Sequence, residues 1–281
     1  MTNTPYPPQR QLSVGEVLDL SFRIYRVTVG KCLLFAGFGV IAAQLPNIYT
    51  LARGRPLMRA TTWADLLVQF RDPELWVMYV VGGVLSALFY AAVLLRQRAI
   101  ISEGAIGGEL VAAVRRVPAL IGLGVLVVLG IAALFVPAAL IGGALRALLI
   151  LAALIALCYW LVAISCAQTI LMIDGAGPAA SVARSWRLTT GSFWRLSVIY
   201  TVALIVLLVL YTVSAAVAGF LAGVLGRGDF AIATASAEVL VVALGALVTP
   251  FYGAVALAVL ADLKVRKEGA DLERRISSAT A

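Results

Sequence analysis

The sequence predicts an all-α fold: a polytopic membrane helical bundle of six transmembrane helices with short amphipathic interfacial helices. Hydrophobic residues make up 62% of the 281 residues and charged residues only 13%. A soluble domain is about 45–50% apolar and about 25% charged, so this composition is typical of a membrane protein. The mean hydropathy is +1.02. The apolar runs are continuous rather than alternating with a period of two, which favours helices over membrane-spanning strands.

Six apolar runs are long enough to cross about 30 Å of hydrocarbon as helices. They cover residues 31–51, 75–97, 118–141, 145–172, 194–226 and 231–263. Pro46 stands near the end of the first run, and Pro137 interrupts the third. The long connection 52–74 contains a candidate surface helix, TTWADLLVQF, which ends before Asp72-Pro73.

Lysine and arginine are distributed unequally between alternate connections. Sixteen of the 22 lie on the side that carries both chain ends. The other six are Arg53, Arg55, Arg59, Arg71, Arg146 and Arg227. Because cytoplasmic loops carry the excess of basic residues, we expect the N- and C-termini in the cytoplasm, which an even number of spans also requires.

The chain is expected to form a single membrane domain, residues 12–268, built from three repeated units. Each unit begins near a glycine, continues as a short helix of apolar and arginine residues, and leads into a two-span hairpin. Ser13 and Glu16 match a capping box, and Pro178 stands where a first helical turn accepts proline. The units cover about 12–103, 104–173 and 174–268, between a disordered tail at 1–11 and a polar tail at 269–281.

Several classes of site are excluded by composition. Histidine is absent, which removes His-based metal sites and catalytic triads. Cys32, Cys158 and Cys166 lie in or beside apolar runs without CxxC spacing, so they indicate neither a disulfide framework nor a zinc site. Asp72 and Glu74 flank Pro73 and are better explained by a turn and a helix start. We therefore expect no catalytic residues, no metal, no cofactor and no enzymatic activity.

Three polar side chains lie within the spans, where polar groups are costly to bury. Glu238 is about two turns into the sixth span. It is either a proton or ion site or, as we favour, a carboxylate near the outer interface that snorkels or bonds to Thr234 or Ser236. Gln44 and Gln168 are neutral amides, which commonly bridge neighbouring helices.

The segment 174–195 is the richest candidate for contact with lipid or a partner. Its candidate contacts are Arg184, Trp186, Arg187, Trp194 and Arg195. The arginines can reach phosphates, and the tryptophans can fix depth at the interface. A specific headgroup site and an ordinary amphipathic anchor both remain open, and the anchor is the commoner case. The net charge of +8, concentrated at span ends, favours anionic membrane lipids as partners over nucleic acid.

Three stretches resemble motifs of a bacterial multi-pass family, named after the membrane domain of glycerophosphoryl diester phosphodiesterases. They are LSVGEVLDLSFRIYR at 12–26, GPAASVARSWRLTTGSFWR at 177–195 and DLKVRKEGADLE at 262–273. The matching positions are Gly15, Glu16, Asp19, Tyr25, Arg26, Arg184, Ser185, Trp186, Gly191, Phe193, Trp194, Arg195, Asp262, Lys267, Glu268, Gly269 and Asp271. The resemblance implies a stand-alone protein of the bacterial cytoplasmic (inner) membrane. It implies no phosphodiesterase activity, because in fusion members that activity belongs to a separate soluble barrel with a catalytic histidine.

Two functions from different classes follow from these observations. One is a non-enzymatic membrane scaffold or accessory component whose basic cytoplasmic helices contact lipid headgroups, a protein partner or a second copy. The alternative is a transporter or lipid-handling permease. The sequence favours the scaffold because few polar residues are expected at mid-membrane. A polar cavity inside the bundle would favour the alternative.

Overall fold

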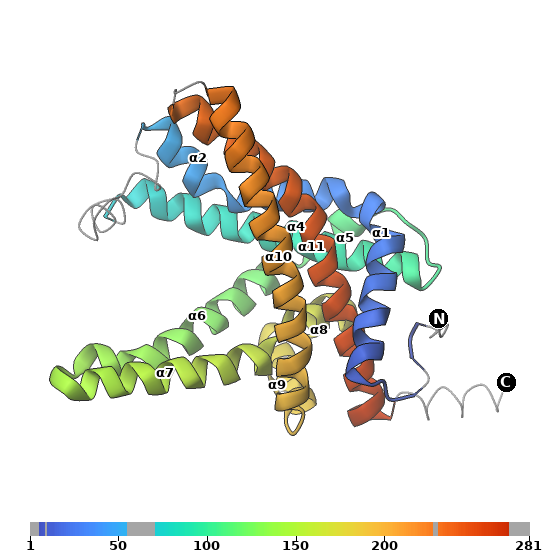
Figure 1. The fold of residues 1–281 in the computed structure, drawn as a ribbon. Coiled ribbons are helices and arrows are strands. Elements are labelled where there is room, and N and C mark those ends of the chain that lie inside the picture. Colours follow the sequence, from blue (N-terminus) through green and yellow to red (C-terminus); the bar gives the residue numbers. More distant parts are fainter. Residues whose placement is uncertain (1–5, 9, 55–70, 227–229, 270–281) are drawn as a thin grey trace.

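The computed structural model describes residues 6–8, 10–54, 71–226 and 230–269, and this part of the chain forms ten helices (Figure 1). They are α1 (Val14–Ala43), α2 (Leu45–Ala52), α4 (Pro73–Ile101), α5 (Glu109–Arg115), α6 (Val117–Leu140), α7 (Gly143–Ile164), α8 (Ala167–Asp174), α9 (Pro178–Thr189), α10 (Phe193–Gly226) and α11 (Phe230–Glu268). The candidate surface helix at 61–70 and the tail at 270–281 lie outside the described residues.

Five helical segments are long and apolar enough to cross a membrane. They are Val14–Ala43, Pro73–Ile101, Val117–Leu140, Leu145–Asp174 and Glu238–Glu268. A sixth candidate is the pair Pro178–Thr189 and Phe193–Val209, which meets the same criterion when its two helices are taken together. The all-helical fold and the multi-pass membrane character are thus confirmed, and the sixth crossing depends on this bent pair.

The bent pair turns by 103° between α9 and α10. Gly191 lies in the turn with φ of +78°, a left-handed conformation that glycine adopts without steric cost. The N–H of Thr190 still donates to the carbonyl of Trp186, at 2.9 Å, and closes the last turn of α9. Because of this bend, the pair is a broken span or a re-entrant segment and not one straight helix.

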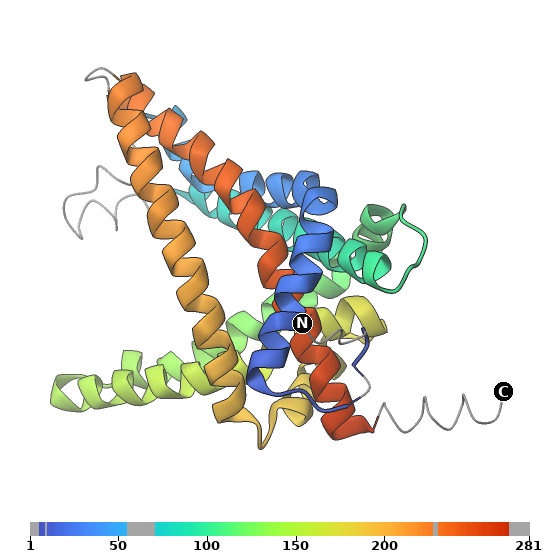
Figure 2. The same ribbon diagram turned by 45° about the vertical axis from the view of Figure 1, so that its right-hand side comes forward.

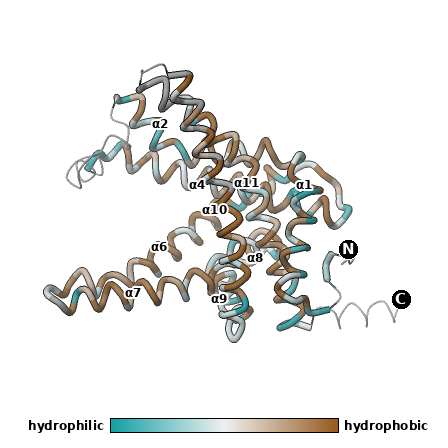
Figure 3. The backbone as a smooth tube through the Cα atoms, in the orientation of Figure 1, coloured by the Kyte–Doolittle hydropathy of each residue, from teal (hydrophilic) through white to brown (hydrophobic). Residues whose placement is uncertain are grey.

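Three hairpins splay outward from a common base (Figures 1 and 2). In Figure 1 the α10–α11 hairpin rises to the top, the α6–α7 hairpin extends to the lower left, and α2 and α4 lie between them. Hydrophobic residues cover α6, α7 and much of α10, whereas hydrophilic residues lie near the start of α1, at α9 and at the end of α11, and also at the opposite end near α2 and the start of α4 (Figure 3). This distribution suits a protein whose base faces water and whose hairpins lie in lipid.

The core lies at the base, where α1 packs against both α4 and α11. Gln97 on α4 is fully buried there, and its Nε2 donates to Thr28 Oγ1 at 3.2 Å and to the Pro250 carbonyl at 2.7 Å. This amide joins three helices that are far apart in sequence. The largest buried apolar cluster includes Leu20, Ile24, Leu94, Ile170 and Leu257.

The first helix breaks at a different place from the one that the sequence predicted. A break between an interfacial helix and the run 31–51 was expected, but α1 continues without interruption to Ala43. Its buried face repeats every four residues at Ile24, Thr28, Cys32 and Ala36, so packing holds the segment helical throughout. The break falls later, because Pro46 has no N–H to donate and its ring clashes with the preceding turn.

The fourth predicted run, 145–172, is divided in a similar way into α7 and α8. The division falls at Ser165 and Cys166, and the whole segment still qualifies as one span. Residues expected to form a disordered tail at 1–11 make defined contacts where they are described: the Tyr6 hydroxyl accepts a hydrogen bond from Arg98, at 3.1 Å, and Pro8 is buried.

Both predicted helix starts are confirmed. Ser13 Oγ accepts from the Glu16 N–H, and Glu16 Oε2 accepts from the Ser13 N–H at 2.7 Å, which forms the capping box. Pro178 occupies the first turn of α9. Both signals depend only on neighbouring residues and not on tertiary packing, so they can be recognised in the sequence.

Candidate functional site

Two adjoining cavities lie between the hairpins. The first, of about 590 Å³, is lined by residues of α1, α2, α4, α8 and α11. The second, of about 410 Å³, is lined by residues of α4, α6, α7, α8 and α11. Both are lined by Ala87, Tyr90, Gln168 and Tyr252. We call the two cavities the first and second lobe, and these four shared residues the waist.

Helical periodicity places the lining residues on continuous faces. On α4, Tyr79, Gly83, Ser86 and Tyr90 recur at intervals of three or four and line the first lobe, which is the spacing of one helix face. On α6, residues 120, 123, 124, 127 and 128 line the second lobe with the same spacing. Each face belongs to a helix that is long and apolar enough to cross a membrane.

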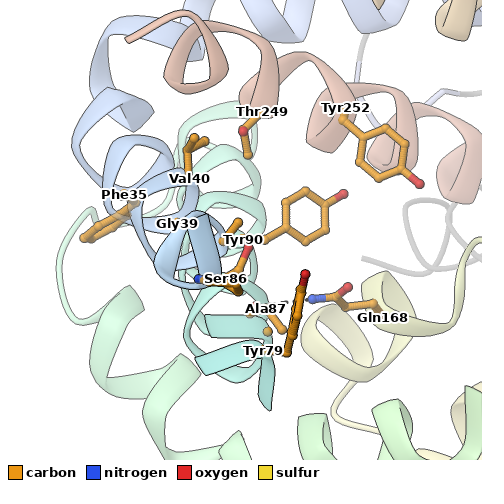
Figure 4. A pocket seen from close by; sticks show the side chains of 13 residues that line it. Phe35, Gly39, Val40, Tyr79, Ser86, Ala87, Tyr90, Gln168, Thr249 and Tyr252 are labelled. Atoms are coloured by element: carbon orange, nitrogen blue, oxygen red, sulfur yellow. Dashed lines mark hydrogen bonds between the residues drawn. The ribbon is translucent and has the colours of Figure 1, made fainter. Parts of the chain in front are cut away.

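Polar groups converge at the waist (Figure 4). The rings of Tyr90 and Tyr252 are tilted against each other, with centroids 5.8 Å apart. Gln168 Nε2 donates to the Ala87 carbonyl at 3.3 Å. Neither the Tyr90 nor the Tyr252 hydroxyl has a hydrogen-bond partner within the part of the chain that the structure describes. Figure 4 shows the Tyr79 hydroxyl, the Tyr90 ring and the Gln168 amide around one common space.

The remaining lining is neutral. Among the described residues, neither lobe is lined by an aspartate, glutamate, lysine or arginine. Thr249 contributes a hydroxyl, but this donates to the Gly245 carbonyl of its own helix at 2.8 Å. The cavity can therefore hold apolar chains and hydrogen-bond an uncharged group, but it offers no charge to pair with an ionised one.

The three predicted intramembrane polar residues do not come together. Gln168 bridges α8 to α4 at the waist. Gln44 lies in the break between α1 and α2, where its Oε1 accepts from Asn47 Nδ2 at 2.7 Å. Glu238 lies on α11 outside both linings, and its Oε2 is enclosed without a hydrogen-bond partner among the described residues. Only Gln168 contributes to the cavity.

A group of ionised side chains at the base, the basal ion network, consists of Asp174, Arg184, Arg195, Asp262, Lys264, Arg266 and Glu268. Its centre is Asp262, whose side chain is 1% exposed. Asp262 accepts from Arg195 Nη1 at 2.6 Å, from Arg266 Nε at 3.0 Å and from the Leu12 N–H at 2.8 Å. Arg195 Nη2 also donates to the Leu12 carbonyl at 2.7 Å. The network therefore links Leu12, just before α1, to the end of α11.

Arg184 forms the second centre of the network. Its Nε and Nη2 donate to the two carboxylate oxygens of Glu268, at 2.8 and 2.7 Å, and its Nη1 donates to Asp174 at 2.8 Å. Lys264 donates to the other Asp174 oxygen at 2.7 Å. Arg184 and Arg195, expected to reach lipid phosphates, are thus engaged with carboxylates of the same chain.

The other candidate contacts of segment 174–195 have different surroundings. Arg187 is exposed and forms no ion pair with a described residue. Trp186 packs against Tyr159 and Trp160 on α7, with ring centroids 5.5 and 6.0 Å apart. Trp194 is 81% exposed beside Phe193. Arg187 and Trp194 are therefore exposed without the ring packing on α7 that partly covers Trp186.

Asp72 and Glu74 occupy the opposite end of the molecule and have structural contacts. Asp72 caps α4 by accepting from the Glu74 N–H at 2.9 Å. Glu74 accepts from the Tyr49 hydroxyl at 2.6 Å and pairs with Arg53. Within the described ranges, no three cysteine, aspartate or glutamate side chains form a group that could hold a metal ion.

The tyrosines of the waist were not identified from the sequence. A usable signal existed, because Tyr90 and Tyr252 carry hydroxyl groups in the middle of apolar runs. In comparisons with known proteins, no family model, no curated protein and no solved structure matches the chain. Its resemblance to the bacterial membrane-domain family remains a prediction.

Proposed function

We propose that the protein is a non-enzymatic, lipid-handling component of the bacterial cytoplasmic membrane, and that its two-lobed cavity holds part of a membrane lipid. The observation that carries the proposal is the convergence of neutral hydrogen-bonding groups between helices that are long and apolar enough to cross a membrane. The waist brings together Tyr90, Gln168 and Tyr252 from three different helices. The sequence favoured a scaffold because such convergence was not expected.

The physical argument concerns what can occupy this space. Each lobe lies within the range of about 300–1,000 Å³ that is usual for ligand pockets. Their walls are predominantly apolar side chains of spanning helices, so lipid chains entering between the splayed hairpins would bury apolar surface there.

Filling the lobes with protein side chains tests the proposal. Gly83 lines the first lobe and Gly124 the second, and a Cβ added at either meets no atom within 4 Å. We expect the double variant Gly83→Leu, Gly124→Leu to retain several-fold less co-purifying lipid than the wild type, as measured by native mass spectrometry. Gly30→Leu, which also has open space and lines neither lobe, is the matched control. Equal lipid retention by all three proteins would contradict the proposal.

A second candidate function, a scaffold that binds anionic lipid, is favoured by a different observation. Arg26, Lys31, Arg115 and Arg187 are exposed and form no ion pair with the described part of the chain. Each basic residue near an anionic surface contributes about 1 kcal/mol of attraction. If this function holds, Arg115→Gln with Arg187→Gln weakens binding to vesicles containing phosphatidylglycerol and leaves the occupancy of the lobes unchanged.

A further inference from the structure

The division of the cavity into two lobes restricts the shape of a ligand. This restriction is stronger than the one that the volume of the cavity sets. The first lobe extends along α1 and α4 towards Pro46, and the second extends along α6 and α7. They share the four residues of the waist, where the Tyr90 and Tyr252 hydroxyls and the Gln168 amide lie. Other hydroxyl groups line the lobes as well, but those of Thr249 and Ser165 donate to carbonyls of their own segments, Gly245 and Val162. A ligand that fills both lobes and uses the unpartnered groups of the waist therefore carries two apolar branches joined at a polar point.

The polar point must be uncharged. The hydroxyl groups of Tyr90 and Tyr252 can each donate and accept, and Gln168 Oε1 makes no hydrogen bond with a described residue, so it can accept. No ionised side chain among the described residues lines either lobe. An ionised group brought to the waist would lose its hydration without gaining a counter-charge, which disfavours its binding.

From these observations we propose that the cavity binds an uncharged two-chain glycerolipid of the diacylglycerol class. One acyl chain lies in each lobe, and the glycerol hydroxyl and ester groups hydrogen-bond to Tyr90, Tyr252 and Gln168. This assignment rests on the proposed function, because it names the ligand of the same cavity. A phosphate headgroup would have to leave the waist, so a phospholipid with the same chains binds more weakly.

Competition for a photoactivatable diacylglycerol tests the ligand class. The probe carries a diazirine on one acyl chain, and the full-length protein is placed in phosphatidylcholine nanodiscs. We expect dioleoylglycerol to suppress labelling of lobe residues at mole fractions roughly tenfold lower than dioleoylphosphatidylglycerol or monooleoylglycerol.

Removal of the waist hydroxyls tests the polar contact without changing volume. Tyr90→Phe with Tyr252→Phe should raise the concentration of dioleoylglycerol needed for competition about tenfold, the effect of losing one or two hydrogen bonds. Tyr25→Phe is the control, because Tyr25 lines neither lobe. An unchanged competition curve in the double variant would overturn the assignment of the waist.

Single substitutions test whether both chains are held. Gly83→Leu and Gly124→Leu should each reduce labelling on their own, because each obstructs one lobe. If only one of them does so, or if phosphatidylglycerol competes as well as diacylglycerol, the two-chain neutral ligand is wrong while lipid handling stands. If no lipid probe labels either lobe, the proposed function fails as well.

Discussion

At the scale of single residues, ion pairs within the chain stabilise the base of the molecule. The charges in these pairs are therefore not available to lipid. Arg195 donates to buried Asp262 at 2.6 Å and to the Leu12 carbonyl at 2.7 Å. Removing the guanidinium leaves a buried carboxylate with fewer donors, and a hydrogen bond to a charged group contributes about 1.5–3 kcal/mol. We expect Arg195→Gln to lower the free energy of unfolding by roughly 2 kcal/mol, measured by thermal unfolding in detergent.

Arg187 provides the matched control for this substitution. It lies on the neighbouring helix α9, is exposed and forms no ion pair with a described residue. Its charge acts on Glu268 only at a distance, so Arg187→Gln should lower the unfolding temperature much less than Arg195→Gln. If both variants unfold at the wild-type temperature, the pairing of Arg195 with Asp262 does not contribute to stability.

Glu109, at the start of α5, makes stability depend on pH. Burial raises the pKa of this carboxyl, but hydrogen bonds from Arg96 and the Gly107 N–H outweigh burial and hold the pKa below its ordinary value of 4.5. The unfolded chain therefore takes up this proton first as the pH falls. The stabilisation is fully present above about pH 4.5 and is lost as the pH falls through the lower folded value.

The test compares unfolding temperatures of the wild type and Glu109→Gln between pH 7 and pH 3. The wild type should be the more stable protein at pH 7, and its advantage should shrink below about pH 4.5. A difference that stays constant over the whole range would show that Glu109 does not titrate in this way.

Whether a contact between two residues could be predicted depended on how far apart they lie in the sequence. The Ser13–Glu16 capping box spans three residues and is legible in the sequence. The partners of Asp262 include Arg195, 67 residues away, and the Leu12 N–H, 250 residues away. A sequence shows which charges are present but not which of them fold together, so Arg195 was assigned to lipid phosphates instead of to Asp262.

At the scale of helices, the packing of α1 against α4 depends on one glycine. A Cβ on Gly82 would lie 2.5 Å from the Ala42 carbonyl oxygen, a backbone atom near the end of α1. The two helices would have to separate, and overpacking of this kind costs roughly 1–3 kcal/mol. We therefore expect Gly82→Ala to lower the unfolding temperature in detergent.

The neighbouring Gly83 offers a control on the same helix. A Cβ there meets no atom within 4 Å, and alanine is favoured over glycine inside a helix by about 1 kcal/mol. Gly83→Ala should leave stability unchanged or raise it slightly. Equal destabilisation by both substitutions would contradict this assignment, because Gly83→Ala introduces no such contact with α1.

Helix positions were largely predictable because hydropathy decides which segments can lie in lipid. The positions at which helices break could not be predicted in the same way. Pro46 stands in the first run, but only the packing of Thr28 and Ala36 shows that the helix continues through residues 26–33 and breaks at Gln44. The cavity was missed for a related reason: Tyr90 and Tyr252 are 162 positions apart in the chain, and only the arrangement of α4 and α11 brings their rings to 5.8 Å.

At the scale of the whole molecule, the basal ion network constrains the number of crossings. The Leu12 N–H, just before the first span, donates to Asp262 near the end of the last span at 2.8 Å. Two groups in direct contact lie on the same face of the membrane, so this contact predicts an even number of crossings. Five segments are long and apolar enough to cross a membrane, and we predict that the bent pair of α9 and α10 supplies the sixth crossing.

Cysteine labelling of the full chain in intact cells tests this topology. In a background with Cys32, Cys158 and Cys166 replaced, Gly226→Cys should react with a membrane-impermeant maleimide. Lys267→Cys should react only after the cells are opened, because the excess of basic residues places the chain ends in the cytoplasm. Gly142→Cys, between α6 and α7, should react from outside whether the chain crosses five or six times.

If α10 does not cross, the first two positions exchange their behaviour: Gly226→Cys is protected and Lys267→Cys is labelled. That result would also require the Leu12–Asp262 contact to be absent in the membrane.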